Sequence, residues 1–98
     1  MNRSHPGAPS LFKLEQNFPN SFNPTTAIQY TIPVGTRQAV SLRVYDVLGR
    51  EVATLVNEVK EPGMYTVLLD AGGLASGVYL YRMEAGDFVQ TRKLVVVR

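Results

Sequence analysis

Few side chains in this sequence could perform nucleophilic, acid–base or metal chemistry. His5 is the only histidine, it lies in the polar first ten residues, and cysteine is absent. These facts exclude a Ser–His pair inside a folded core, a disulfide framework, and a metal site built on two histidines or on thiolates. Carboxylates are left as the candidates for acid–base catalysis or metal binding.

Those carboxylates fall at the expected ends of strands or in turns, where acidic side chains usually cap backbone N–H groups or stay in water. Asp70, beside a glycine-rich loop, is a weak calcium candidate, because no further Asp or Asn follows at alternate positions. We therefore expect no enzyme, no cofactor, and no catalytic or metal-binding residue. The residues concerned are Asp46, Glu51, Asp70, Glu84 and Asp87.

The elements that would position these residues are strands, because the apolar spacing has period two. Residues 27–32, 39–46 and 64–70 each place three apolar side chains on one face, and residues 77–85 place Tyr79, Tyr81 and Met83 opposite Val78, Leu80 and Arg82. Residues 50–56 and 88–97 complete the series, although the inward face of the last run cannot be read from its continuous apolar residues. No helical pattern is present.

Short glycine-containing turns separate these runs at residues 34–38, 47–50, 60–64 and 84–87, which predicts antiparallel neighbours. The loop at residues 71–77 is expected to cross between sheets, with Leu74 plugged into the core. The prediction is an all-β, immunoglobulin-like, two-sheet antiparallel sandwich of about seven strands, with a small barrel as the alternative. Residues 1–10 read as a flexible linker or expression tail and residues 11–98 as the domain.

Charge and hydropathy argue against nucleic acid and membrane partners. The formal net charge is +2, from ten basic and eight acidic residues, and Arg82, Arg92, Lys93 and Arg98 lie near the C-terminus. A basic terminal hairpin is more often a solvated, edge-protecting face than a phosphate site. No apolar run is long enough to insert into a membrane. We expect a monomer.

The stretch "QNFPNSFNPTT", residues 16–26, is too polar for a strand and too aromatic for a linker. Pro19 and Pro24 remove two backbone donors, and asparagine side chains can close local turns. The stretch is expected to form a stiff arm along the sandwich, with Phe18 or Phe22 pinned beneath it. It either caps an open sheet edge or contacts a partner.

Three segments in this order resemble the type A C-terminal sorting domain of the type IX secretion system. They are "LEQNFPNSFNPTTAIQYTIP", "VSLRVYDVLGREVATLV" and "GLASGVYLYRMEAGDFVQTRKLVVVR", which together span about residues 14–98. Ser21 departs from the usual proline, Met83 from Leu or Ile, and Arg98 from a terminal Lys. The positions matching the family's motifs, and so implicated in partner recognition, are Pro19, Asn20, Phe22, Asn23, Pro24, Gly77, Tyr79, Lys93, Leu94, Val95 and Arg98.

The resemblance implies an exported protein that passes through the periplasm to the cell surface or beyond. Its folded domain would be recognised by the outer-membrane translocon and then removed by a sortase that cuts within or ahead of residues 1–13, after an unknown cargo. Two other functions stay open. One is a structural module similar to the immunoglobulin-like domain of the flagellar hook-capping protein, and the other is an accessory carbohydrate-binding module of a secreted hydrolase.

Overall fold

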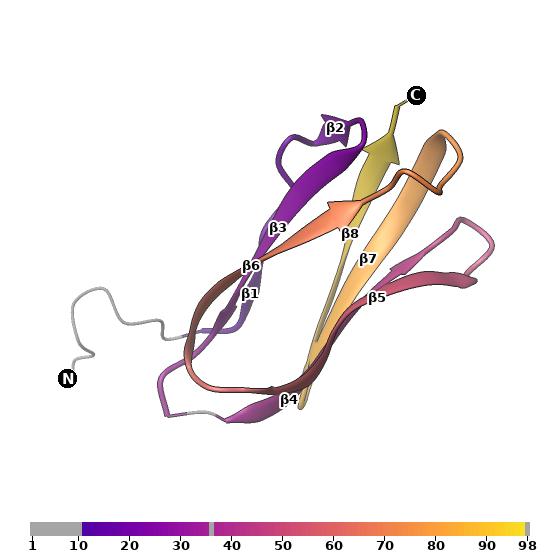
Figure 1. The fold of residues 1–98 in the computed structure, drawn as a ribbon. Helices are drawn as coiled ribbons and strands as arrows, with labels where there is room; N and C mark the ends of the chain where they lie inside the picture. The colour runs from indigo at the N-terminus through magenta and orange to yellow at the C-terminus, as the bar shows by residue number, and fades with distance from the viewer. Residues whose placement is uncertain (1–10, 36, 98) are drawn as a thin grey trace.

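The computed structural model describes residues 11–35 and 37–97, and within them every regular element is a strand (Figure 1). The expected linker at residues 1–10, with His5, and the C-terminal Arg98 lie outside the described residues. No helix in the described part is long and apolar enough to cross a membrane. The strands are β1 Lys13–Leu14, β2 Ser21–Phe22, β3 Thr25–Ile32, β4 Gln38–Tyr45, β5 Glu51–Lys60, β6 Gly63–Asp70, β7 Gly77–Ala85 and β8 Phe88–Val96.

These strands form two sheets, which confirms the predicted all-β sandwich. The smaller sheet has the order β1-β3-β6 and the larger has the order β2-β8-β7-β4-β5 (Figure 1). All pairings between long strands are antiparallel, as predicted. The short β2, however, runs parallel to the end of β8, and no pattern in the sequence predicted this pairing.

The four predicted turns are of two kinds. The turns after β4 and β7 close hairpins between paired strands, whereas those after β3 and β5 lead from one sheet to the other. The prediction of antiparallel neighbours is therefore wrong for the connections at residues 34–38 and 60–64. In the β7–β8 hairpin Gly86 takes a φ of 60° at the first of two turn residues. That position in a tight hairpin favours glycine because a Cβ atom would be strained there. The loop after β6 crosses between sheets as predicted, and Leu74 packs against the core.

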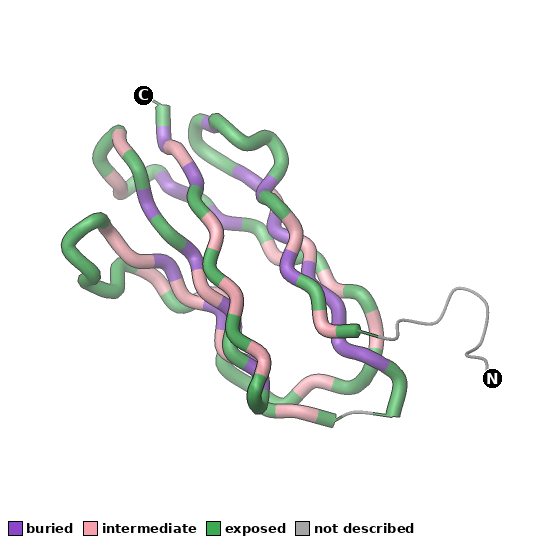
Figure 2. Tube along the Cα trace, turned by 180° about the vertical axis from the view of Figure 1, so that it is seen from behind, coloured by how far each residue is buried: buried purple, intermediate pink, exposed green. Residues whose placement is uncertain are grey.

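Period-two spacing accounts for the core between the sheets. Buried and exposed residues alternate along the central strands (Figure 2), and the inward faces predicted for β3, β4 and β7 are buried. In β8 the inward residues are Leu94 and Val96. In β5 only Val56 is buried, because two register shifts against β4 interrupt the alternation. Each fully buried large apolar side chain stabilises the fold by about 1.5–3 kcal/mol.

Candidate functional site: an arm that closes one side of the sandwich

Residues 13–24, here called the arm, connect the two sheets along one side of the sandwich. At its start β1 pairs with Thr31 and Tyr30 of β3. In its middle Phe18 exchanges two backbone hydrogen bonds with Ala27, at N···O distances of 2.9 and 3.0 Å. At its end β2 pairs with Val95 and Val96 of β8. The arm therefore covers an edge of each sheet, which is one of the two roles expected for it.

Asn17 is the polar centre of the arm and is only 1% exposed. Its carboxamide nitrogen donates to the carbonyl oxygens of Pro19 and Asn20, at 2.9 and 3.2 Å, and to the Thr26 hydroxyl at 3.1 Å. The Thr26 hydroxyl in turn donates to the Pro19 carbonyl at 2.8 Å. Buried polar groups are costly unless hydrogen-bonded, so this network holds the turn at Pro19 in one conformation.

Asn17 does not close an Asx turn. Such a turn needs the backbone N–H two residues ahead, and that residue is Pro19, which has none. The Asn17 amide nitrogen donates to the Pro19 carbonyl. Its amide oxygen accepts from the side-chain nitrogen of Gln16 at 2.7 Å.

Tyr81 of β7 ties the arm to the larger sheet. Its hydroxyl donates to the Glu15 carbonyl at 2.7 Å and accepts from the Asn17 backbone N–H at 2.8 Å. Burial raises the pKa of Tyr81 above its ordinary value, while the hydrogen bond from Asn17 and the charge of Arg92 act in the opposite direction. The hydroxyl consequently keeps its proton and can donate to Glu15 at neutral pH.

Two side-chain bonds fasten the arm to β8. The Arg92 Nε donates to the Leu14 carbonyl, and the Gln16 amide nitrogen donates to the Lys93 carbonyl, both at 2.7 Å. These residues lie more than seventy positions apart in the sequence. The first residues of the arm are therefore held by the last strand of the chain.

The two phenylalanines of the arm have opposite environments. Phe22 is 3% exposed within the core, and its carbonyl accepts from the Val97 N–H at 2.9 Å. Phe18 is 80% exposed on the outer surface. Of the two candidates for the pinned residue, Phe22 is the one that the structure selects.

The residues implicated in recognition gather where the arm meets β7 and β8. Gly77 pairs with Val96, and Val96 pairs with Phe22 on its other side. Buried among them are Phe22, Tyr79 and Leu94, so their side chains support the surface from beneath. The exposed members are Pro19, Asn20, Asn23, Pro24 and Lys93, while Val95 and Gly77 are half-buried and Arg98 lies outside the described residues.

Sequence reasoning did not single out Gln16, Asn17, Thr26, Tyr81 and Arg92 as the residues that hold this surface together. Two weak signals were present. Asn17 and Thr26 lie within the motif that carried the resemblance, and a tyrosine on an inward face needs a hydrogen-bond partner for its hydroxyl. The partners themselves lie far away in the sequence.

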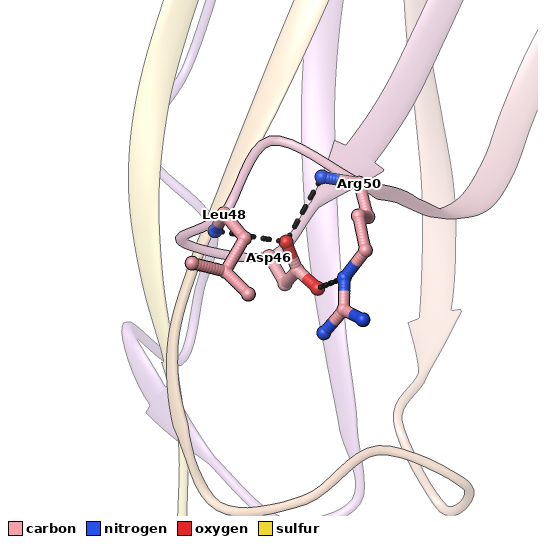
Figure 3. Close-up of polar contacts among 3 residues, drawn as sticks. All are labelled: Asp46, Leu48 and Arg50. Atoms are coloured by element: carbon pink, nitrogen blue, oxygen red, sulfur yellow. Dashed lines mark hydrogen bonds and ion pairs between the residues drawn. The ribbon is translucent and has the colours of Figure 1, made fainter.

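The turn carboxylates cap backbone groups where this was predicted. Asp46 accepts from the N–H groups of Leu48 and Arg50, both at 2.9 Å, and from the Arg50 Nε at 2.7 Å (Figure 3). The hydrogen bonds from Arg50 and Leu48 hold the pKa of Asp46 below its ordinary value. Gly49, with a φ of 86°, completes this hairpin. Asp70 likewise accepts from the Gly72 N–H at 2.9 Å.

Two further carboxylates and two hollows lie on the surface of the described residues. Within residues 11–35 and 37–97 there is no group of three or more metal-binding side chains. Glu51 and Glu84 lie in partly exposed ion pairs with Arg43 and Arg82. An open hollow of about 250 Å³ is lined by Tyr45, Gly49, Leu80, Arg82 and Thr91. Another, of about 270 Å³, is lined by Ala39, Val40, Ser41, Arg43, Asn57, Glu84 and Gly86.

Comparison with known proteins identifies one family. The sequence model of the family described as the secretion system C-terminal sorting domain matches residues 16–97. The matched range begins in the arm, one residue before Asn17, and ends one residue past β8. No curated protein matches the chain.

Proposed function

We propose that the outer-membrane translocon of the type IX secretion system recognises this chain as a folded unit. The chain belongs to the family of secretion-system C-terminal sorting domains. As a member of that family the protein is exported. In the proposed route the domain crosses the periplasm attached to an unknown cargo, and a sortase removes it at the cell surface by cutting within or ahead of residues 1–13. Residues 11–98 form the recognised unit.

The observation that carries this proposal is the connection between the arm and the last strand. The motif residues of the arm and those of β7 and β8 are far apart in the sequence, yet hydrogen bonds from Gln16, Arg92 and Tyr81 join them. An unfolded tail would not present these residues together. A receptor that reads both segments at once therefore has to read the folded domain.

The family match favours sorting over the two other functions considered from the sequence. A carbohydrate-binding module usually offers exposed aromatic rings for stacking on sugars. Tyr79 and Tyr81 are instead buried in the core, and among the aromatic residues of the described part only Phe18 is exposed. The match also favours a sorting domain over a hook-capping module, because it covers most of the chain and names secretion.

The test is delivery of a reporter in a host that has this secretion system. Residues 1–98 are fused to the C-terminus of a periplasmic reporter, and the fraction of reporter at the cell surface is measured by protease accessibility. We expect the intact fusion to reach the surface. Deleting the last five residues removes the partners of β2 in β8 and should leave the reporter in the periplasm. Periplasmic retention of the intact fusion would contradict the proposal.

Removal by a sortase has its own readout. Intact mass measurement of the delivered reporter should show that residues after position 13 are missing. Delivery with the whole domain still attached would refute the sortase step while leaving translocon recognition in place.

A further inference from the structure

The outer edge of β6 has no strand partner in the described part of the chain. In the smaller sheet β6 pairs only with β3, over eight residues from Gly63 to Asp70. Ala27 exchanges its hydrogen bonds with Phe18, and the Gln29 carbonyl accepts from the Glu15 N–H. These groups of β3 point toward the arm and away from β6.

The direction of the free groups on β6 follows from this pattern. Leu68 and Thr66 stand opposite Ala27 and Gln29. In an antiparallel pair, residues opposite a position whose hydrogen bonds point away are themselves turned away. The N–H and C=O groups of Thr66 and Leu68, and by alternation those of Met64, therefore point outward from the sheet edge.

This edge lacks the devices that usually prevent pairing with other chains. Bulges, charged side chains and proline normally protect exposed edge strands. The β3–β6 register is continuous, and residues 63–69 carry no charge. The edge strand of the larger sheet, β5, differs in having two register shifts against β4 and the charged residues Glu51, Glu58 and Lys60.

Apolar side chains lie beside the open edge on the outward face. Met64 is 60% exposed and Leu68 is 65% exposed. Phe18, which is 80% exposed, shares that face because it stands in one row with Ala27 and Leu68, but it lies on the far side of β3 from the edge. Exposed apolar residues that cluster in this way usually mark an interaction surface.

We propose that the free edge of β6 is where a protein of the secretion machinery adds an extended segment as a further strand, with Met64 and Leu68 contacting its side chains. This inference rests on the proposed function, since it adds a second contact surface to the recognition of the folded domain. Backbone hydrogen bonds to Met64, Thr66 and Leu68 would provide affinity, and alternate side chains would provide specificity. We expect the partner's segment to be uncharged where it faces Met64, Thr66 and Leu68, and to carry a cationic side chain beside Asp70.

A second copy of this chain fits the edge less well than a different protein. In the symmetrical antiparallel register that pairs Met64, Thr66 and Leu68 of the two copies, Thr66 of one copy stands opposite Thr66 of the other. This register would place Pro62 opposite Asp70 of the other copy, where the proline has no N–H to donate. A shifted register in which Pro62 stands opposite Leu68 lacks one backbone hydrogen bond between the copies, because proline has no N–H.

The test uses three variants of the reporter fused to residues 1–98. Thr66→Pro removes one outward N–H without touching the bonds to β3, and Thr66→Lys adds a charge at the edge. Gln29→Lys adds the same charge to the same face one strand inward, where Gln29 is paired with Thr66. Losing one edge hydrogen bond should lower affinity on the order of tenfold in Thr66→Pro, and a charge on the edge strand opposes pairing in Thr66→Lys. Surface delivery of both Thr66 variants should therefore fall, by up to about tenfold for Thr66→Pro, while Gln29→Lys is delivered like the unmodified fusion.

Folding is checked on the same variants by thermal unfolding. If Thr66→Pro disturbs the fold, Thr66→Lys decides the outcome. Delivery of a folded Thr66→Lys fusion at the unmodified level would overturn the inference. Retention of the unmodified fusion would instead overturn the proposed function, so the two failures are distinguishable.

A photoreactive residue identifies what lies on the edge. Placed at Leu68 it should crosslink in cells to an outer-membrane component of the secretion system, whereas at Val59 of β5, which is 49% exposed, it should not. A crosslinked dimer of the fusion from position 68 would overturn the inference in favour of a second copy. Equal crosslinking of secretion components from both positions would also overturn it.

Discussion

The two sides of the sandwich are built differently. On one side the arm covers β3 and β8 with backbone pairing and with the buried bonds of Asn17 and Tyr81. On the other side β5 and β6 end their sheets without a further strand among the described residues. Bulges and charges protect β5, whereas β6 is regular and uncharged.

This difference suggests a division of labour. The arm side depends on contacts between residues far apart in the sequence, so changes there should reduce the stability of the whole domain. The side chains of Met64, Thr66 and Leu68 on β6 are exposed, so changes there should affect binding while stability stays nearly constant.

The two phenylalanines of the arm give the largest contrast. Phe22→Ala removes a buried ring and should lower the free energy of unfolding by roughly 3–5 kcal/mol. Phe18→Ala, at an 80% exposed residue, should change it by less than about 0.5 kcal/mol. Chemical denaturation of both purified variants measures the difference. Equal losses would mean that burial does not distinguish these residues.

Asn17→Ala should break the polar centre of the arm. It leaves the Pro19 carbonyl with one donor fewer and the Thr26 hydroxyl without its donor from Asn17, at an expected cost of roughly 2–4 kcal/mol. Asn20→Ala is the matched control, since Asn20 is exposed and contributes to the network mainly through its backbone carbonyl. Its expected cost is below about 0.5 kcal/mol. The comparison fails if the two variants have the same denaturation midpoint.

Tyr81→Phe tests the tie between the arm and the larger sheet. The change leaves the Asn17 N–H and the Glu15 carbonyl without their partner and should cost about 1–3 kcal/mol. Tyr79→Phe removes a single bond to Ala75 within the loop before β7 and should cost about 1 kcal/mol or less. Amide exchange adds a local readout, because only Tyr81→Phe should speed exchange at Asn17. If amide exchange at Asn17 is unchanged in Tyr81→Phe, the Tyr81 hydroxyl does not hold the arm in place.

Substitution of Asp46, in the hairpin between β4 and β5, should have the smallest effect on stability. Because its pKa is lowered in the folded state, its carboxylate stabilises the fold above roughly pH 4, and this contribution disappears as the pH falls through the folded-state value. Asp46→Asn should therefore be less stable than the unmodified protein at neutral pH and approach it in acid. Thermal unfolding between neutral and acidic pH measures the gap. A difference in stability that widens on acidification would contradict a lowered pKa of Asp46.

Much of the sandwich was predictable because burial in a strand follows a period of two. Val40, Leu42 and Val44 alternate with polar residues, and the structure buries all three. The same rule fails for β5, where bulges shift the register by amounts that no local pattern encodes.

The arm and the open edge were less predictable for a different reason. The bond between Asn17 and Tyr81 spans 64 positions, and β2 is a two-residue strand inside a proline-rich stretch. Whether the outer edge of β6 is paired depends on the order of strands in its sheet. Both features are consequences of the complete topology, which apolar spacing does not specify.

The central claim is that secretion reads the folded domain, and temperature tests it directly. Reporter fusions carrying Asn17→Ala or Val59→Ala, at an exposed position of β5, are compared for surface delivery across a range that spans the unfolding midpoint of the purified Asn17→Ala domain. We predict that the Asn17→Ala fusion is delivered below that midpoint and retained above it, while the Val59→Ala fusion is delivered throughout. Efficient delivery of the Asn17→Ala fusion at temperatures where its domain is unfolded would contradict the account.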